Sequence, residues 1–295
     1  MRVFVTGGSG FIGSAVVPGL LGAGHRVLAL ARSDKSAEAL TAAGAEVHRG
    51  SLDDPEDLAR AAAGTDGVIH LAFDHDSFPD MTGPVATDLR VIEAVGTALA
   101  GSDRPFVVTS GTLMLAPNGG VAAEQDTPAP AVHRSAADLA ALALTARGVR
   151  SSVVRLAPTV HGRGDQGFVP RLIDVARRTG VAAYIGAGTN RWPAVHRLDA
   201  AHLFRLALES APAGTALHAA ADQEVPFKDI ATAIGRGLDI PLKSIPAEEA
   251  QTHFGWLGIV ASADNPTSSE RTRSLLGWQP EQPGLIADLE EGHYF

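Results

Sequence analysis

Glycine spacing near the N-terminus is the first feature of the sequence that points to chemistry. Residues 6–13 read TGGSGFIG and lie between a short apolar run and a helical pattern. In such a turn the first glycine permits a tight bend, the second lets backbone amides approach a pyrophosphate, and the third lets the helix pack closely on the strand. The turn therefore predicts a dinucleotide site, with a purely structural turn as the alternative. The residues expected to hold the cofactor are Gly7, Gly10, Phe11, Ile12 and Gly13.

Apolar runs that alternate with helical patterns must position this turn. Nearly continuous Val, Ile and Leu indicates strands of a parallel sheet buried on both faces, and the alternation implies a doubly wound α/β fold of the Rossmann type. The expected strands are 2–6, 25–30, 45–50, 67–72, 105–110 and 150–157, and the expected helices are 11–22, 34–43, 55–63, 84–100 and 133–147. Asp54 is expected to cap the third of these helices, with Pro55 as its first residue.

The regular alternation ends near residue 157. Beyond it, helical patterns at 168–179, 199–210 and 227–238 are separated by loops rich in Gly and Pro. The sequence therefore predicts a dinucleotide-binding domain over 1–157 and a smaller, mostly helical substrate-binding lobe over 158–295, with segments that interleave.

Composition excludes several classes of function. The net charge is −9 and the Lys and Arg residues are scattered singly, which argues against a nucleic-acid partner. The absence of cysteine excludes disulfides, thiolate metal sites and thiol nucleophiles, and no metal site is expected. The chain starts on a predicted strand rather than an export signal, and no apolar run approaches a membrane span. We expect a cytoplasmic protein whose partner is a small-molecule substrate and which does not bind a membrane.

The order of motifs resembles a known superfamily. TGGSGFIG followed by GVIHLAF, VVTSG, RLAPTVHG and VHRLDAAHLF is similar to the extended short-chain dehydrogenases/reductases, in their NAD-dependent epimerase/dehydratase branch. The likeness covers most of the chain and is strongest over 1–110 and 150–205. It implies a dinucleotide cofactor and further contacts to it. These are Ser51 and Leu52 at the adenine, Leu71, Ala72 and Phe73 along the cofactor, and Pro158 and Thr159 at the nicotinamide.

The end of the second strand bears on which cofactor is bound. An NAD site places a carboxylate there for the ribose 2′-hydroxyl, whereas RVLALARSD offers Arg32 and Ser33. A cation with a hydroxyl suits a 2′-phosphate, so NADP is predicted. Asp34 lies close enough for NAD to remain possible as the cofactor. The alternative role for Arg32 is a solvated charge at the end of a strand. Many relatives carry Asp where Ser51 stands, so the adenine contact is expected to differ here.

The catalytic pattern of the superfamily is incomplete. The resemblance implies that Ser110 or Thr112, in VVTSGTLM, polarises a substrate oxygen, and that a Tyr-x-x-x-Lys pair follows at the start of the next helix. That stretch reads PAPAVHRSAADLAAL, with Val132 and Ala136 at the two positions. The chain has two tyrosines, both far along the sequence at Tyr184 and Tyr294. The protein is therefore expected to be an atypical member that lacks the usual proton donor.

Other side chains are candidates for the proton donor and for substrate contacts, each with a structural or surface role as the alternative. His133 stands beside the vacant position and could titrate near neutral pH. His161 follows the sixth strand, where members of the family approach the substrate. His75 and Asp76 follow the fourth strand, where ligands bind in such sheets. Arg191 and Trp192 are expected to contact an anionic or flat substrate.

Three further expectations concern supporting residues. His70 is expected to be a packed core histidine. Asp199 is expected to cap the helix that follows NRWPAVHRL. Residues 112–131 are too long and irregular for a simple connector, which favours a lid or binding loop over a plain surface excursion.

The favoured function is an NADPH-dependent reductase of a small or medium organic carbonyl, or a related double bond, that works without the usual Tyr acid. Two alternatives from other classes stay open: an NAD(P)-binding sensor or regulator without redox turnover, and a non-redox isomerase or cyclase. The helices expected at 84–100 and 133–147 carry apolar stripes that fit either a dimer interface or the sheet, so both a monomer and a homodimer remain open.

Overall fold

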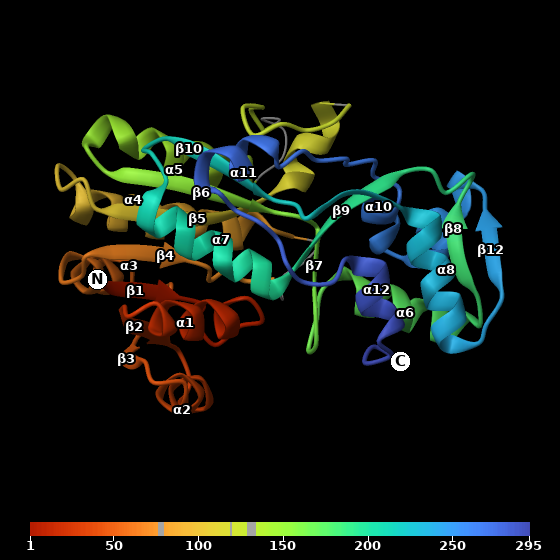
Figure 1. Ribbon diagram of the computed structural model, residues 1–295, viewed down its shortest axis with the longest axis horizontal. Coiled ribbons are helices and arrows are strands. Elements are labelled where there is room, and N and C mark those ends of the chain that lie inside the picture. Colours follow the sequence, from red (N-terminus) through yellow and green to blue (C-terminus); the bar gives the residue numbers. More distant parts are fainter. Residues whose placement is uncertain (76–79, 119, 129–133) are drawn as a thin grey trace.

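A parallel sheet forms the larger of two lobes in the computed structural model (Figure 1). The structure describes residues 1–75, 80–118, 120–128 and 134–295. The sheet has seven strands in the order β10-β6-β5-β4-β1-β2-β3, and all neighbours are parallel. This order confirms the predicted Rossmann-type doubly wound sheet. Its strands are β1 (Arg2–Thr6), β2 (Arg26–Ala31), β3 (Glu46–Arg49), β4 (Gly67–His70), β5 (Pro105–Gly111), β6 (Arg150–Leu156) and β10 (Thr215–Ala219).

Helices cover both faces of this sheet because successive side chains of the central strands alternate between two apolar layers. In β1, Val3 and Val5 join the core beneath one set of helices, and Phe4 joins the core beneath the other. The first face carries α1 (Gly13–Gly22), α2 (Asp34–Ala42) and α7 (Arg197–Ser210). The second carries α3 (Pro55–Ala63), α4 (Thr82–Leu99) and α5 (Ser135–Ala143), which is continued by the 3-10 helix η2 (Leu144–Arg147).

The start of α3 shows how local sequence sets these helices. Asp54 accepts a hydrogen bond from the backbone N–H of Asp57 at 3.0 Å, and Pro55 is the first helical residue. Proline at this position loses no helical hydrogen bond, and the acidic residues of the first turn face the positive end of the helix dipole. The predicted cap is confirmed.

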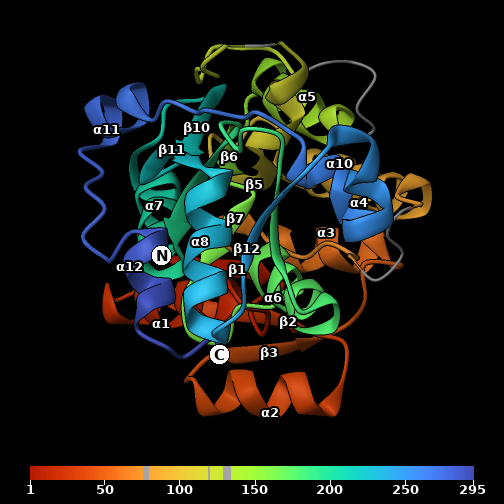
Figure 2. The same cartoon turned by 90° about the vertical axis from the view of Figure 1, so that its right-hand side faces the viewer.

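The smaller lobe combines helices with short strands, which the sequence analysis had not predicted (Figure 2). One sheet joins β7 (Thr159–His161), β9 (Arg191–His196) and β11 (Asp222–Pro226), and another pairs β8 (Ala182–Ile185) with β12 (Leu242–Ile245). Around them lie α6 (Phe168–Thr179), α8 (Phe227–Leu238), η3 (Ala247–Glu249), α9 (Ala250–Phe254), α10 (Leu257–Ala261) and α12 (Leu285–Glu290). No helix within the described ranges has the length and apolar character needed to span a bilayer.

The chain passes between the lobes more than once. After β9, residues 197–219 return to the large sheet as α7 and β10, and α11 (Glu270–Leu276) packs on both. Trp278 follows α11 and is fully buried, with its indole N–H donating to the carbonyl of Asp199 at 3.0 Å. The lobes therefore share segments that are far apart in the sequence.

Asp199 does not cap α7, so that prediction is wrong. His196 is the N-cap residue, and its Nδ1 accepts from the N–H of Leu198 at 3.3 Å. Asp199 lies within the first turn, where its carboxylate accepts from the backbone N–H groups of Glu281 and Gln282. It therefore fastens the returning chain to the helix, a contact that local sequence does not reveal.

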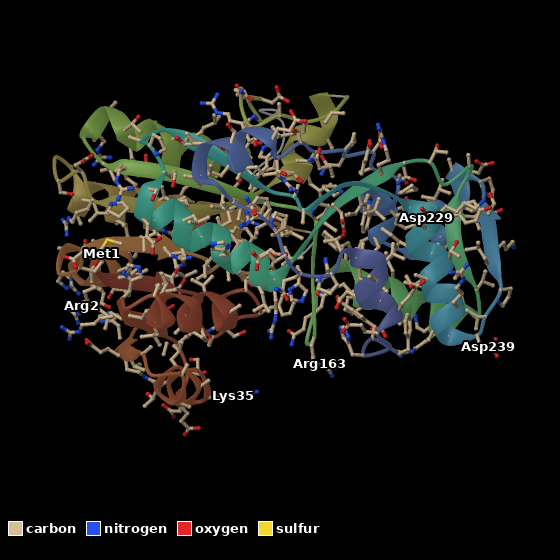
Figure 3. The ribbon with its side chains drawn as sticks, in the orientation of Figure 1. Met1, Arg2, Lys35, Arg163, Asp229 and Asp239 are labelled. Atoms are coloured by element: carbon tan, nitrogen blue, oxygen red, sulfur yellow. The ribbon has the colours of Figure 1, made fainter. Side chains whose placement is uncertain are left out.

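The C-terminal residues are packed against the loop that follows β7. The Tyr294 hydroxyl accepts from the N–H of Gly162 at 3.0 Å and donates to Asp165 at 3.1 Å. Asp165 also accepts from the N–H of Gly167. Arg163 lies at the outer tip of this loop (Figure 3). Burial, the largest influence, raises the pKa of Asp165 to about 6.

Replacement of Asp165 by asparagine should change how stability depends on pH. Because the folded-state pKa, about 6, lies above the ordinary 3.8, the folded chain binds this proton more tightly than the unfolded chain. Its stability therefore falls as pH rises through this window. Asp165→Asn removes that dependence. Between pH 4 and pH 7.5, the free energy of unfolding of the variant should therefore rise by about 2 kcal/mol relative to that of the wild type. Urea denaturation at both pH values measures this.

The control is Asp239→Asn, which removes an exposed carboxylate. Its free energy of unfolding should track the wild type across the same range. Parallel pH profiles for Asp165→Asn and the wild type would contradict the assignment.

Candidate functional site

The glycine turn is held so tightly that side chains are excluded from two of its positions. Gly7 has a φ of +69°, and a Cβ there would lie 2.7 Å from the backbone nitrogen of Ala72. A Cβ at Gly13 would lie 2.1 Å from the carbonyl oxygen of Gly7. At Gly10 the space is open except for that same oxygen, at 3.3 Å. Helix α1 starts here without a side-chain cap or an acidic residue in its first turn, so its N-terminus suits an anion.

A line of buried polar groups fixes the turn to the neighbouring strand. Thr6 Oγ1 lies 2.6 Å from His70 Nδ1, and His70 Nε2 lies 2.8 Å from Asp88 Oδ1 on α4. The Thr6 oxygen also accepts from the N–H of Ala72 at 3.2 Å, which leaves its own proton free to point at Nδ1. All three side chains are buried, so β1, β4 and α4 are joined at the edge where a ligand is expected. His70 is packed in the interior, and its two ring nitrogens also connect Thr6 to Asp88.

The end of β2 presents cations. Arg32 is exposed there, and Ser33 caps α2 by accepting from the N–H of Ser36. Arg49 donates to the carbonyl of Ser33 at 2.7 Å and to the carboxylate of Asp34 at 2.6 Å. The carboxylate that would favour NAD is therefore already engaged by a neighbouring guanidinium.

The remaining residues expected along the cofactor lie at the carboxyl ends of the parallel strands. Ser51 donates to Asp53 at 2.9 Å, and Leu52 is half-buried beside the apolar core under α3. Leu71, Ala72 and Phe73 follow β4 and are half-buried. Pro158 and Thr159 follow β6; the Thr159 hydroxyl is buried and finds no hydrogen-bond partner in the part of the chain that the structure describes.

Ser110, at the end of β5, belongs to a buried charged network. Its hydroxyl donates to Asp138 Oδ2 at 3.0 Å. Arg155 donates to the same carboxylate from Nε at 2.8 Å, and both charged side chains are buried. A hydroxyl has one proton, so in this geometry Ser110 can accept a hydrogen bond from a substrate but cannot donate one.

Thr112 and the loop after it are tied to the C-terminal part of the chain. Thr112 is fully buried in the 3-10 helix η1 (Thr112–Asn118), and its hydroxyl accepts from Asn265 at 2.9 Å. Farther along, buried Glu124 accepts from the N–H and the hydroxyl of Thr272, at 2.7 and 2.8 Å. At these two points the loop is fastened to the protein.

Three predicted residues lie in or against the smaller lobe. His161 Nδ1 is 2.8 Å from buried Asp288. Trp192 has no exposed surface and meets Phe227 edge to face at 5.1 Å between ring centroids. Arg191 pairs with two carboxylates on the same lobe, and the hydrogen bond to Asp264 raises its pKa most. Among the described residues, none of these three side chains forms a hydrogen bond or ion pair with Ser110.

Two candidates, His133 and Asp76, lie outside the described residues. His75 is described and exposed, and its ring centroid is 5.0 Å from that of Phe73. It therefore lies next to Phe73, a residue expected to line the cofactor, and its contact with the substrate stays a prediction.

Arg134, just before α5, was not among the residues predicted from the sequence. Its guanidinium carbon lies 3.8 Å from the ring centroid of Phe73. Its Nε is buried, with no hydrogen-bond partner among the described residues. Burial lowers the pKa of Arg134, opposed by the nearby charge of Asp88. The sequence did offer one signal for this residue: Arg134 is the cation that lies between the positions expected for Tyr and Lys, and small residues follow it in RSAA.

Comparisons with known proteins bear on the family and the fold of the chain. A model of the NAD dependent epimerase/dehydratase family matches residues 3–220. An uncharacterized protein of Schizosaccharomyces pombe is 49% identical over 296 residues, with 100% of both chains covered. The 2-alkyl-3-oxoalkanoate reductase of Stenotrophomonas maltophilia is 33% identical over 232 residues, covering 73% of this chain and 68% of that one. The structure of DesIV, a dTDP-glucose 4,6-dehydratase from Streptomyces venezuelae with NAD and TYD bound, has a TM-score of 0.78 at 20% identity, covering 99% and 96%.

The glycine turn gives a direct test of dinucleotide binding. Gly13→Ala would force a methyl group onto the carbonyl of Gly7, so the turn must open and binding of NADPH and NADH should weaken at least about tenfold. Gly19→Ala, in the same helix, meets no atom within 4 Å and is the matched control. It should bind both dinucleotides like the wild type and gain up to about 1 kcal/mol in stability. Calorimetric titration measures both, and unchanged affinity in Gly13→Ala would contradict the assignment of the turn.

Proposed function

The chain belongs to the NAD-dependent epimerase/dehydratase family, and from that premise we propose that it is an NADPH-dependent reductase of a small or medium organic carbonyl compound. The observation that carries the proposal is the turn in which Gly7 and Gly13 leave no room for a Cβ beside an uncapped helix N-terminus. That cradle fits the pyrophosphate of a dinucleotide. When bound, the reduced nicotinamide supplies a hydride to the carbonyl carbon of the substrate.

The protein's own residues then have separate tasks. Backbone amides around Gly10 hold the phosphates, and the unpartnered hydroxyl of Thr159 provides a hydrogen bond to the nicotinamide. The proton of Ser110 is committed to Asp138, so Ser110 orients a substrate that carries a hydrogen-bond donor beside its carbonyl group, by accepting from that donor. Exposed His75 or water delivers the proton that completes the alcohol.

Reduction is favoured over the other chemistries of this family for two reasons. The relative from Stenotrophomonas maltophilia is named a reductase of an oxoalkanoate, which is a carbonyl substrate. Sugar-nucleotide epimerases and dehydratases of this superfamily rely on the tyrosine that this chain lacks. Positioning of the substrate supports hydride transfer without that tyrosine, since acid catalysis typically contributes only about 10² to 10⁴ in rate.

NADPH is proposed as the cofactor because of the charges at the end of β2. Arg32 is exposed beside the N-terminus of α2, and Asp34 is paired with Arg49. A 2′-phosphate placed there would meet the guanidinium of Arg32 and the hydroxyl of Ser33, and a cation with a hydroxyl suits that anion.

A panel of aldehydes and ketones tests the proposed reaction. The wild-type protein should bind NADPH more tightly than NADH and should oxidise NADPH in the presence of at least one carbonyl compound, followed by cofactor absorbance. Tight binding without turnover on every compound would favour the sensor or the non-redox enzyme instead. No binding of either dinucleotide would overturn all three.

The cofactor preference has its own test in Arg32→Ala. Loss of a charge-assisted hydrogen bond to the 2′-phosphate should weaken NADPH binding about 10- to 100-fold and leave NADH binding within about twofold. Arg26→Ala removes an exposed arginine from the other end of the same strand and should change neither affinity. Equal NADPH affinity in Arg32→Ala and the wild type would show that Arg32 is only a solvated charge.

A further inference from the structure

Arg134 stands where the family's catalytic pair is missing. It immediately precedes α5, two residues after Val132 and two before Ala136, the positions at which the tyrosine and lysine are expected. Neither replacement residue can donate a hydrogen bond from its side chain. Arg134, between these two positions, carries a side chain with several donors.

The guanidinium is held in place by an aromatic ring. Its carbon lies 3.8 Å from the centroid of Phe73, the close approach expected for an arginine over the face of an aromatic ring. Phe73 follows β4 on the edge that carries the glycine turn, and a Cβ at Gly7 would lie 2.7 Å from the backbone nitrogen of Ala72, the residue before Phe73. The arginine is therefore anchored beside the expected cofactor rather than extended into solvent.

Two polar atoms at Arg134 and Asp88 lack hydrogen-bond partners among the described residues. Asp88 is near enough for its charge to raise the pKa of Arg134, yet the two residues form no ion pair within 4.0 Å among those the structure describes. One Asp88 oxygen is paired with His70; the other is buried and has no partner in the described chain. Arg134 Nε is likewise buried without a partner. Buried donors are rarely left in this state, so Arg134 Nε marks a place for a ligand atom that accepts a hydrogen bond.

We propose that Arg134 donates hydrogen bonds to the carbonyl oxygen of the substrate, in the place of the missing tyrosine, and that Asp88 positions it; this rests on the proposed reductase function. Ser110 cannot donate a hydrogen bond to the substrate while its hydroxyl donates to Asp138. The ligand class is an aldehyde or ketone with an uncovered carbonyl oxygen.

The proposed step balances without a tyrosine. The carbonyl carbon gains a C–H bond with the two electrons and hydrogen of the reduced dinucleotide, which becomes oxidised. The π electron pair of the C=O bond moves to oxygen, where the guanidinium stabilises the new charge. Arginine keeps its proton at any working pH, so His75 or water supplies the proton that gives the alcohol.

The test uses the full-length protein and a carbonyl compound that the wild type reduces. Arg134→Gln should lower kcat/KM at least about 100-fold, the usual effect of removing an oxyanion donor. Arg134→Lys should retain part of the activity, and Arg134→Ala should regain activity when guanidinium chloride is added at millimolar concentration. Arg90→Gln, which removes an exposed arginine from α4, is the control and should match the wild type.

A binding measurement separates this proposal from the reductase assignment. Isobutyramide offers a carbonyl oxygen that is not reduced, and its binding to the protein saturated with NADPH is followed by cofactor fluorescence. The amide should bind the wild type and Arg90→Gln, and binding should be lost in Arg134→Gln with NADPH affinity unchanged. Reduction by the wild type with equal amide binding and equal kcat/KM in Arg134→Gln would overturn the role of Arg134 alone. Absence of reduction by the wild type, with NADPH bound, would overturn the reductase function on which it rests.

Discussion

The hydrogen bond between Thr6 and His70 is the constraint on which the candidate site depends. At 2.6 Å it joins the last residue of β1 to the last residue of β4, and the Thr6 hydroxyl also accepts a hydrogen bond from the N–H of Ala72. The backbone of Ala72 therefore sits against Gly7, which excludes every side chain from that position. His70 continues the line to Asp88 on α4, so the cofactor turn and the opposite helical layer are fixed to the same strand end.

Asp88 connects His70 to Arg134, which lies between the positions where the catalytic tyrosine and lysine are expected. Its charge acts on Arg134, whose guanidinium lies over Phe73, three residues beyond His70. A phenol both stabilises the charge on a substrate oxygen and delivers a proton, whereas a guanidinium performs only the first task. In this account, charge stabilisation is assigned to Arg134 and the proton comes from His75 or water. Ser110 is left as an acceptor because Asp138, held by Arg155, takes its proton.

The sequence predicted what depends on neighbouring residues and missed what depends on distant ones. The parallel sheet, the glycine turn and the Asp54 cap follow from periodicity and short spacing, and the structure agrees with them. The five short strands of the smaller lobe have too little periodicity to be seen in single runs. Asp199 was misassigned because its true partners lie more than 80 residues away. Arg134 was overlooked because its proposed role depends on Phe73 and Asp88, which are distant in the sequence and come near it only in the fold.

The central claim is that this edge of the sheet transfers a hydride to a carbonyl carbon without a tyrosine. The most direct measurement is a single turnover with NADPH carrying deuterium at both reactive positions of the nicotinamide ring, followed by mass spectrometry and NMR of the product. The account predicts one deuterium on the carbon that bears the new hydroxyl group and none on its oxygen. A product without deuterium, formed while the labelled cofactor stays reduced, would contradict it.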